Sequence, residues 1–220
     1  SVVIHNAAQT DIMRPMDQKD ARRQLGLAED DYIVGFAGTL APWQGLDLLV
    51  QAAQEVIDNA PRPVRFVLVG DGQCRQQLEQ MVGQLGLGVF FSFLAPVPSE
   101  EVAVFNNACD VIVCPRYDPR TLRYGMSVLK FWDAVSVGVP VLVPKGSQLD
   151  DVLARLGLPE VFPPGDKKQL AEAIVEVLKN TEHYQSRRKD VHRIVSEQYS
   201  WTRVAEKLAE HCRRLKVKTQ

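Results

Sequence analysis

The sequence predicts an α/β fold, a Rossmann-like doubly wound parallel sheet of about six strands with helices on both faces and further helices at the carboxyl end. Three observations lead to this prediction. Short apolar runs recur without polar alternation, as strands buried on both faces require. Segments of helical periodicity separate these runs. Glycine and proline mark many of the turns between the two kinds of segment.

The elements follow one another in a regular order. A strand-like run at residues 2–4 and a short helix at about 17–25 come first. Strand and helix then alternate, and each right-handed crossover places the next strand parallel to the last. The expected strands are residues 33–38, 64–69, 89–94, 111–114, 140–143 and 161–162. Helices are expected at 46–57, up to about 85, at 99–108, from about 127, and at 149–156, 167–179, 181–198 and 201–216.

Composition limits the class of protein. With 220 residues, 45% of them hydrophobic and 24% charged, the chain can bury a full core. A formal net charge of −1 gives no footprint for nucleic acid. The basic stretch 212–218 leaves a peripheral contact with the inner face of a membrane open. Four cysteines without metal-ligand spacing predict reduced thiols in a cytoplasmic protein, and the start at Ser1 suggests a piece of a longer chain.

One stretch, residues 124–133, carries the main chemical signal. Ser127, Lys130 and Asp133 follow at steps of three residues, so on a helix they face one way. Ser127 is a candidate N-cap, and the unpaired N–H groups after it form an anion site. A lysine in that turn is disfavoured unless an anion binds there. From spacing alone, an ordinary helix with a solvated lysine explains the pattern equally well.

Ligands of doubly wound sheets bind outside the carboxyl ends of the strands. The candidate loops are residues 38–45, 70–72, 94–98 and 115–127. They lack the Gly-x-Gly-x-x-Gly dinucleotide fingerprint and the Gly-Lys-Ser/Thr phosphate loop, and the four histidines lie away from them, so no metal site is expected. The loop after residue 114 holds three arginines that could clamp phosphate, although for any single one of them a solvated loop charge is the better explanation: Arg116, Arg120 and Arg123.

Seven segments follow one another in a characteristic order: residues 3–6, 35–45 with 48–49, 68–72 with Arg75 and 78–79, 127–133, 138–141, 163–166 and 199–201. In these segments, and so over nearly its whole length, the chain resembles the carboxyl-terminal, donor-binding half of a GT-B glycosyltransferase of family 4. The resemblance implies transfer of a sugar from a nucleoside-diphosphate sugar to an acceptor, with retention at the anomeric carbon. The acceptor, a sugar or a lipid-linked group, would bind to an amino-terminal domain outside this sequence.

Carried over by position, the resemblance implies a role for each site residue. Asp133 would hold the ribose hydroxyls, Lys130 would meet the diphosphate, and both are the expected catalytic residues. The backbone near Val97 would contact the base. Further expected donor-binding residues are Gly38, Thr39, Gln44, Gly70, Asp71, Ala95, Arg116, Met126, Ser127 and Val128. Neither a metal nor another cofactor is implied.

Four positions depart from the family pattern. Gly125 stands where the first of two glutamates is expected, and Asp133 replaces the second. Thr39 and Gln44 replace an arginine and a lysine found in many members, so two cations for the diphosphate are absent. Stabilisation of the leaving diphosphate would therefore fall on Lys130, the helix amides and an arginine of the 115–127 loop.

The expected domain organisation has three parts. Residues 1–16 resemble an interdomain crossover segment, 17–180 form the nucleotide-sugar-binding domain, and 181–220 are helices that pack on its flank or toward a missing domain. Two alternatives to a transferase stay open at this point. One is a binding module that holds a nucleotide sugar without catalysis, and the other, from the fold alone, is a nicotinamide-dependent oxidoreductase.

Overall fold

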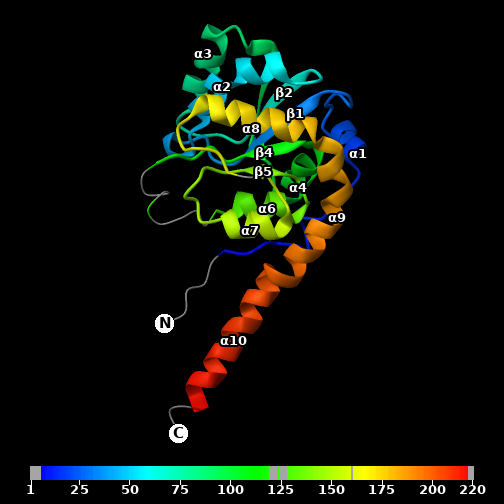
Figure 1. Cartoon of the computed structure of the whole chain (residues 1–220), viewed down its shortest axis with the longest axis vertical. Coiled ribbons are helices and arrows are strands. Elements are labelled where there is room, and N and C mark those ends of the chain that lie inside the picture. Colours follow the sequence, from blue (N-terminus) through cyan, green and yellow to red (C-terminus); the bar gives the residue numbers. More distant parts are fainter. Residues whose placement is uncertain (1–5, 119–122, 124–127, 160, 218–220) are drawn as a thin grey trace.

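The computed structural model describes residues 6–118, 123, 128–159 and 161–217. Its centre is a five-stranded sheet in the order β3-β2-β1-β4-β5 (Figure 1). Every neighbouring pair of strands is parallel. The strands are β1 (Tyr32–Ala37), β2 (Val64–Val69), β3 (Phe91–Leu94), β4 (Val111–Val113) and β5 (Val141–Leu142). The prediction of a doubly wound parallel sheet is confirmed.

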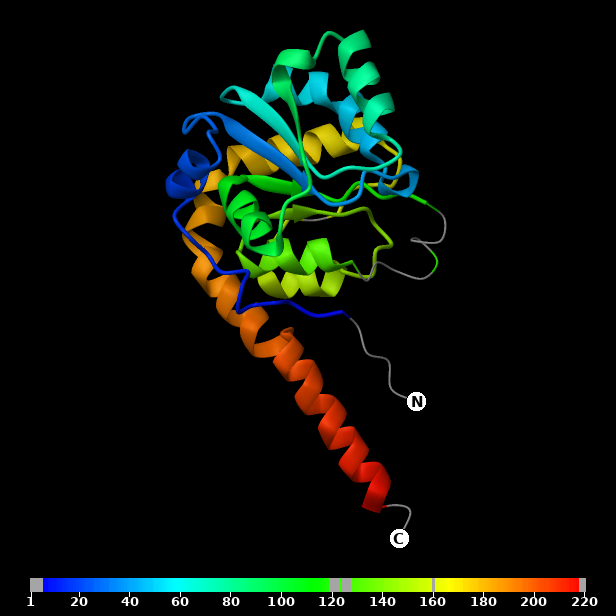
Figure 2. The ribbon, with the colours of Figure 1, turned by 180° about the vertical axis from the view of Figure 1, so that it is seen from behind.

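Helices cover both faces of the sheet. Alternate residues of each strand point to opposite faces, so Val34 and Phe36 enter one core cluster and Ile33 enters the other. The helices of the first face are α2 (Leu46–Asn59), α3 (Arg75–Gln84) and α8 (Lys167–Lys179). Those of the second are α4 (Ser99–Ala108), α6 (Leu129–Ser136), α7 (Asp150–Leu156) and α9 (Thr181–Gln198). Figures 1 and 2 show these two layers from opposite sides.

The smaller elements lie at the edges. Helix α1 (Gln18–Gln24) is capped by Asp17, whose carboxylate accepts a hydrogen bond from the Asp20 amide, and it packs against α4. Two single turns of 3-10 helix, η1 (Pro42–Gln44) and η2 (Gly88–Phe90), precede α2 and β3. Helix α10 (Trp201–Val217) extends away from the rest of the molecule (Figures 1 and 2). None of the helices in the described part of the chain is long and apolar enough to cross a membrane.

The strand order fixes where a ligand can bind. The chain runs outward from β1 through β2 to β3, and then returns to the other side of β1 to form β4 and β5. The loops that leave β1 and β4 therefore diverge and open a crevice at the carboxyl edge. Gly38 and Pro115 stand near the starts of these two loops. A glycine is needed at Gly45, since a Cβ there would lie 2.4 Å from the Pro115 carbonyl oxygen.

Two expected elements differ from the structure. The strand expected at residues 161–162 is a single parallel bridge between Phe162 and Pro144, so the described residues form five strands. Pro163 and Pro164 follow at once, and proline has no N–H to extend the pairing. The central helix begins at Leu129 with Val128 as its N-cap, and no side chain caps it. The expected N-cap, Ser127, lies outside the described residues, as do the strand-like run 2–4 and Gly125.

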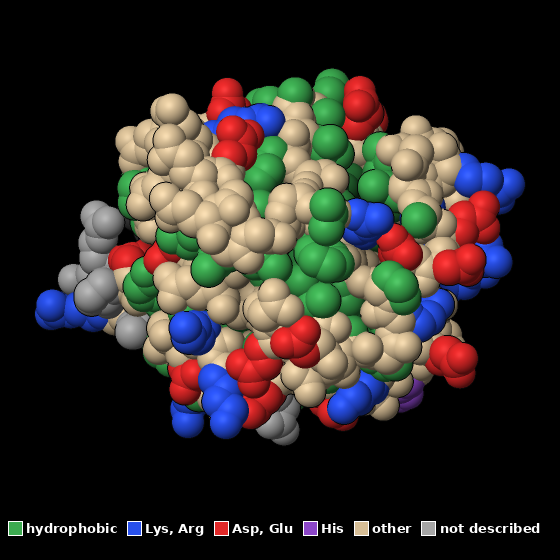
Figure 3. All heavy atoms as spheres, turned by 90° about the horizontal axis from the view of Figure 1, so that it is seen from above, with side chains coloured by type: hydrophobic (Ala, Val, Ile, Leu, Met, Phe, Trp, Pro, Cys, Tyr) green, Lys and Arg blue, Asp and Glu red, His purple; other side chains and the backbone are tan. Residues whose placement is uncertain are grey.

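Helix α9 holds the carboxyl-terminal part of the chain to the sheet layer. It packs on α6 and α7, and Arg188 donates hydrogen bonds to the carbonyl oxygens of Asn107 and Cys109 at 2.9 and 2.7 Å. At its end, Tyr199 stacks on Trp132 of α6. The amino-terminal segment crosses here, because Ala8 and Ser200 form a parallel bridge. On the face seen from above, acidic and basic side chains are intermixed around hydrophobic ones (Figure 3).

Candidate functional site

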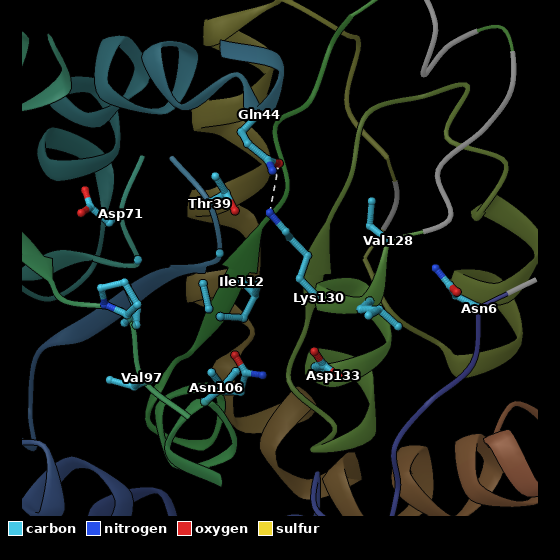
Figure 4. A pocket seen from close by; sticks show the side chains of 17 residues that line it. Asn6, Thr39, Gln44, Asp71, Val97, Asn106, Ile112, Val128, Lys130 and Asp133 are labelled. Carbon is cyan, nitrogen blue, oxygen red and sulfur yellow. Dashed lines mark hydrogen bonds between the residues drawn. The ribbon is translucent and has the colours of Figure 1, made fainter. Parts of the chain in front are cut away.

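A pocket of about 680 Å³ opens at the carboxyl edge of the sheet (Figure 4). It lies where the loops after β1 and β4 diverge, and residues that follow each of these two strands line it. Nine of the residues expected from the sequence line it: Gly38, Thr39, Gln44, Gly70, Asp71, Val97, Val128, Lys130 and Asp133. These residues come from five separate segments of the chain, which the parallel sheet brings to one edge.

Lys130 lies in the first turn of α6 and reaches across the pocket toward η1 (Figure 4). Its ammonium donates a hydrogen bond to Gln44 Oε1 at 3.0 Å. The same nitrogen lies 4.0 Å from the centroid of the Phe36 ring, within the range of a cation–π contact. Within the described part of the chain, no carboxylate forms an ion pair with Lys130. The positive charge is therefore held by neutral groups beside an open cavity.

The surroundings of Lys130 weaken its hold on a proton. Burial lowers the pKa of Lys130 to about 8, and the nearby Arg116 adds to this decrease. The glycine at position 38 leaves space for this position of the ammonium, since a Cβ there would lie 2.9 Å from the lysine nitrogen and the lysine would have to shift. Gly38 also has φ of +140°, which favours glycine. The pocket thus contains a cation that an anionic ligand would stabilise.

The amino end of α6 faces the same space. Val128, Leu129 and Lys130 all line the pocket, and the first N–H groups of a helix have no partner within it. These groups and the helix dipole favour an anion at this position. A lysine at the positive end of a helix is otherwise unfavourable. The two features together make this part of the pocket suited to a phosphate or diphosphate.

Asp133 lies one turn further along α6, at the other end of the pocket from the Lys130 ammonium (Figure 4). Desolvation raises the pKa of this carboxyl to about 6. Its side chain has no hydrogen bond or ion pair with any residue that the structure describes. A half-buried carboxylate with its acceptor sites open is suited to bind hydroxyl groups of a ligand.

The remaining predicted site residues either do not line the pocket or lie outside the described residues. Arg116 does not line the pocket, and its Nε lies 2.8 Å from Asp118 Oδ2 in an ion pair. Ala95 is exposed outside the lining, whereas its neighbours Pro96 and Val97 belong to it. Met126 and Ser127 lie outside the described residues. The assignment of these side chains to donor binding stays a prediction.

Several residues that line the pocket were not predicted as site residues, although some of them lie in the motif segments. The most notable is Asn106 on α4, which is only 2% exposed. Its position in an otherwise apolar helix face gave no motif, and only the packing of α4 against α6 places it there. Other lining residues of this kind are Asn6, Ala37, Val69, Val102, Ile112 and Leu129. No group of three potential metal ligands occurs among the residues that the structure describes.

The fold is that of a doubly wound α/β domain with a pocket at the carboxyl edge of its sheet, and comparison with known proteins identifies the family. The family model for glycosyl transferases group 1 matches residues 17–210. The chain therefore belongs to the glycosyl transferases group 1 family, and its similarity to the carboxyl-terminal half of GT-B glycosyltransferases is confirmed. This assignment also argues against the nicotinamide-dependent oxidoreductase.

Three known proteins are similar to this chain in sequence or in fold. The D-inositol 3-phosphate glycosyltransferase of Geodermatophilus obscurus is 31% identical over 191 residues, which are 83% of this chain and 41% of that protein. HepE of Anabaena, solved with UDP, aligns with a TM-score of 0.78 at 23% identity over 97% of this chain and 57% of its own. The isolated C-terminal domain of the group 1 protein LpcC from Francisella tularensis aligns with a TM-score of 0.72 at 18% identity, over 87% of this chain and 98% of that domain.

The alignments with the curated relatives cover only part of the length of those proteins. This chain spans less than half the length of the curated relatives that it matches. It also covers nearly all of the LpcC domain, which has the same fold. The structure accordingly has its own sheet, two core clusters and a pocket.

Proposed function

We propose that this chain is the donor-binding half of a retaining glycosyltransferase, which binds a nucleoside-diphosphate sugar and works with an acceptor-binding domain elsewhere in the full-length protein. Membership of the family supports sugar transfer. The structure of HepE with UDP supports a nucleotide sugar as the donor. The relative named D-inositol 3-phosphate glycosyltransferase supports a polyhydroxylated acceptor, for which this chain has no assigned site.

The observation that carries the proposal is the environment of Lys130. Its ammonium lies beside an open pocket, at the amino end of a helix, with an amide and an aromatic ring as its neighbours. A partly buried cation without an anionic partner is unfavourable, and a bound diphosphate would remove that penalty. The carboxylate of Asp133 at the other end then matches the hydroxyl groups of a ribose.

In this arrangement the chain stabilises the leaving group. When the bond between the anomeric carbon and the diphosphate oxygen breaks, the bonding electron pair stays on that oxygen. Lys130 and the N–H groups at the start of α6 lie where they would bind this developing charge. Gln44 keeps the ammonium at the edge of the pocket, and its amide group could donate a further hydrogen bond to phosphate. The proposal involves no metal ion.

Calorimetric titration of the 220-residue chain tests the donor assignment. The ligands are the diphosphates of uridine, guanosine, adenosine and thymidine, together with their hexose conjugates. We expect the nucleotides of one base to bind with a dissociation constant in the micromolar range or below. If the nucleotides of all four bases gave neither a heat of binding nor a shift in the unfolding temperature, a nucleotide-sugar site would be rejected.

A binding module without catalysis is the second candidate, and one observation favours it. Thr39 and Gln44 line the pocket as neutral residues, so among the described lining residues Lys130 is the one cation. Less positive charge would give less stabilisation of the departing diphosphate. Turnover of the bound donor by the full-length protein separates the two candidates, with a Lys130→Ala variant as the control. Donor binding without measurable transfer would favour the module.

A further inference from the structure

Two neighbouring asparagines on α4 differ completely in their environment. Asn107 is fully buried, its Oδ1 accepts from the Met16 amide at 2.9 Å, and its Nδ2 donates to the carbonyl oxygens of Arg14 and Ala103, both at 2.9 Å. Asn106 is 2% exposed, yet its side chain has no hydrogen bond with any residue in the described part of the chain. Asn107 therefore has a structural role, whereas no contact within the protein accounts for Asn106.

Among the residues that the structure describes, Arg188 Nε is the one fully enclosed side-chain polar atom without a partner. The polar atoms of Asn106 are therefore accessible from the pocket, although the residue as a whole is almost completely buried. The carboxamide of Asn106 lies at the wall of the pocket, on the same side as Val97 and Asp133 (Figure 4). A polar side chain that faces a pocket and has no partner within the protein is a candidate for ligand binding.

The neighbours of Asn106 indicate what it would bind. Val97, Val102 and Ile112 line the same part of the pocket and are apolar. A flat ring with apolar faces and a polar edge fits such a wall better than a sugar, whose hydroxyl groups point in all directions. The carboxamide presents one donor and one acceptor side by side, which matches the edge of a nucleobase. Lys130 and the start of α6 lie at the other end, where the diphosphate is placed.

The helix that carries Asn106 is firmly held. Two hydrogen bonds of Asn107, with Arg14 and Met16, tie it to the segment before α1, and a third is made to Ala103 within α4. Arg188 from α9 and Arg22 from α1 bind the carbonyl oxygens at its carboxyl end, and Arg22 also pairs with the buried Asp110 at 2.7 Å. A carboxamide on so rigid a support would meet a ligand with little loss of conformational entropy.

We propose that Asn106 is a specificity residue of this pocket, and that its carboxamide binds the hydrogen-bonding edge of the donor's nucleobase. The inference rests on the proposed function, because it assigns the base end of the same site. It makes the choice of base depend on a side chain in addition to the backbone near Val97. It also gives a reason for a polar side chain at a position whose neighbours in the pocket wall are largely apolar.

The test compares the chain with its Asn106→Leu variant, which keeps the branched shape and removes both hydrogen-bonding groups. Titrations use the four nucleoside diphosphates and inorganic pyrophosphate, which has no base. We expect the variant to lose about tenfold in affinity for the preferred nucleotide, as one or two buried hydrogen bonds imply. Affinity for the other nucleotides should change less and affinity for pyrophosphate should stay the same, so the preference among bases becomes weaker.

Thermal unfolding without ligand supplies an independent readout. The Asn106→Leu variant should unfold at the same temperature as the original chain or higher, whereas Asn107→Leu should unfold several degrees lower. An equal loss for all five ligands, or no loss for any, would overturn the role of Asn106. Asn106→Ala, which also lacks the amide, gives the same comparison if leucine does not fit. Failure of the original chain to bind any nucleotide would instead reject the proposed function itself.

Discussion

The ammonium of Lys130 lies 3.0 Å from Gln44 Oε1 and 4.0 Å from the centroid of the Phe36 ring, and neither partner is negatively charged. Both partners stabilise a cation less than a carboxylate would. Lys130 is thus oriented by its neighbours but not neutralised by them. This relationship leaves the pocket suited to an anion, and the expected outcomes for Lys130, Gln44 and Gly38 follow from it, while those for Asp133 concern the opposite end of the pocket.

Replacing Lys130 with alanine should weaken the binding of nucleoside diphosphates far more than the binding of nucleosides. The loss of a charge-assisted hydrogen bond corresponds to about 1.5–3 kcal/mol, or roughly 10- to 150-fold in affinity. A nucleoside has no phosphate for the ammonium to bind, so its affinity should change little. Calorimetry with the preferred nucleoside diphosphate and its nucleoside measures the difference. Equal losses for both ligands would show that Lys130 acts through the structure of the pocket.

The affinity for a nucleotide sugar should depend on pH. Because the pKa of Lys130 is about 8, the free lysine loses its proton as the pH rises through that value, and binding should weaken. Below a pH of about 6 Asp133 becomes protonated, since its pKa is raised, and ligand binding should weaken there as well. A nucleotide sugar is the right ligand, because its diphosphate has no titration between these values.

Proton uptake on binding directly tests the expected loss of affinity at high pH. A bound diphosphate stabilises the charged lysine and so raises the pKa of Lys130. Near pH 8, binding should therefore take up about half a proton from the buffer. Titrations in two buffers of different ionisation enthalpy measure this number. No uptake at pH 8, together with a flat affinity between pH 7 and 9, would contradict a charged Lys130 at the diphosphate.

Changing Gln44 to glutamate should convert the hydrogen bond to Lys130 into an ion pair. The new carboxylate raises the pKa of Lys130 and cancels its charge, so donor affinity should fall about tenfold or more. The loss of affinity at high pH should move to a higher pH. Gln51→Glu is the matched control, because Gln51 is exposed on α2 and the change in net charge is the same. Equal effects of the two variants would indicate a general effect of charge on the anionic ligand.

Much of the fold was predictable because it follows from local patterns. Buried strands without alternation and helices of period 3.6 depend on nearby residues, and both α8 and α9 have the bounds expected from the sequence. Element ends that depend on tertiary pairing were not predictable in the same way. The start of α6 and the reduction of the last strand to one bridge at Phe162 are of this kind.

The site was predictable only in part, and for a physical reason. Gly38, Lys130 and Asp133 stand in motifs, and the parallel sheet brings the ends of its strands to one edge. Asn106 lies inside a helix, and its neighbour Asn107 looks identical in the sequence. The two residues differ in their hydrogen bonds. Those of Asn107 are made with residues 14 and 16, more than 90 positions away in the chain. No local pattern contains that information.

Asp133 should be a site residue that lowers stability at neutral pH. Its pKa is raised from 3.8 to about 6, so the folded state binds more protons than the unfolded state between these values. The free energy of unfolding therefore falls as the pH rises through about 6. Asp133→Asn should remove this pH dependence and raise the free energy of unfolding by about 1 kcal/mol at pH 7.5. Asp133→Ala should weaken donor binding by about 1–3 kcal/mol. Urea unfolding at pH 4.5 and 7.5, and calorimetry with the donor, measure the two effects.

Gly38→Ala should disturb the pocket through Lys130. The added Cβ would lie 2.9 Å from the lysine nitrogen, so the ammonium must move away from Gln44, and the φ of +140° is strained for alanine. We expect a loss of stability of about 1–3 kcal/mol and a loss of diphosphate affinity like that of Lys130→Ala. Gly26→Ala is the control, because Gly26 also has positive φ, at +65°, but a Cβ there meets nothing within 4 Å. It should lose stability and keep donor affinity, and if both variants bind donor normally, the position of the Lys130 ammonium does not determine diphosphate binding.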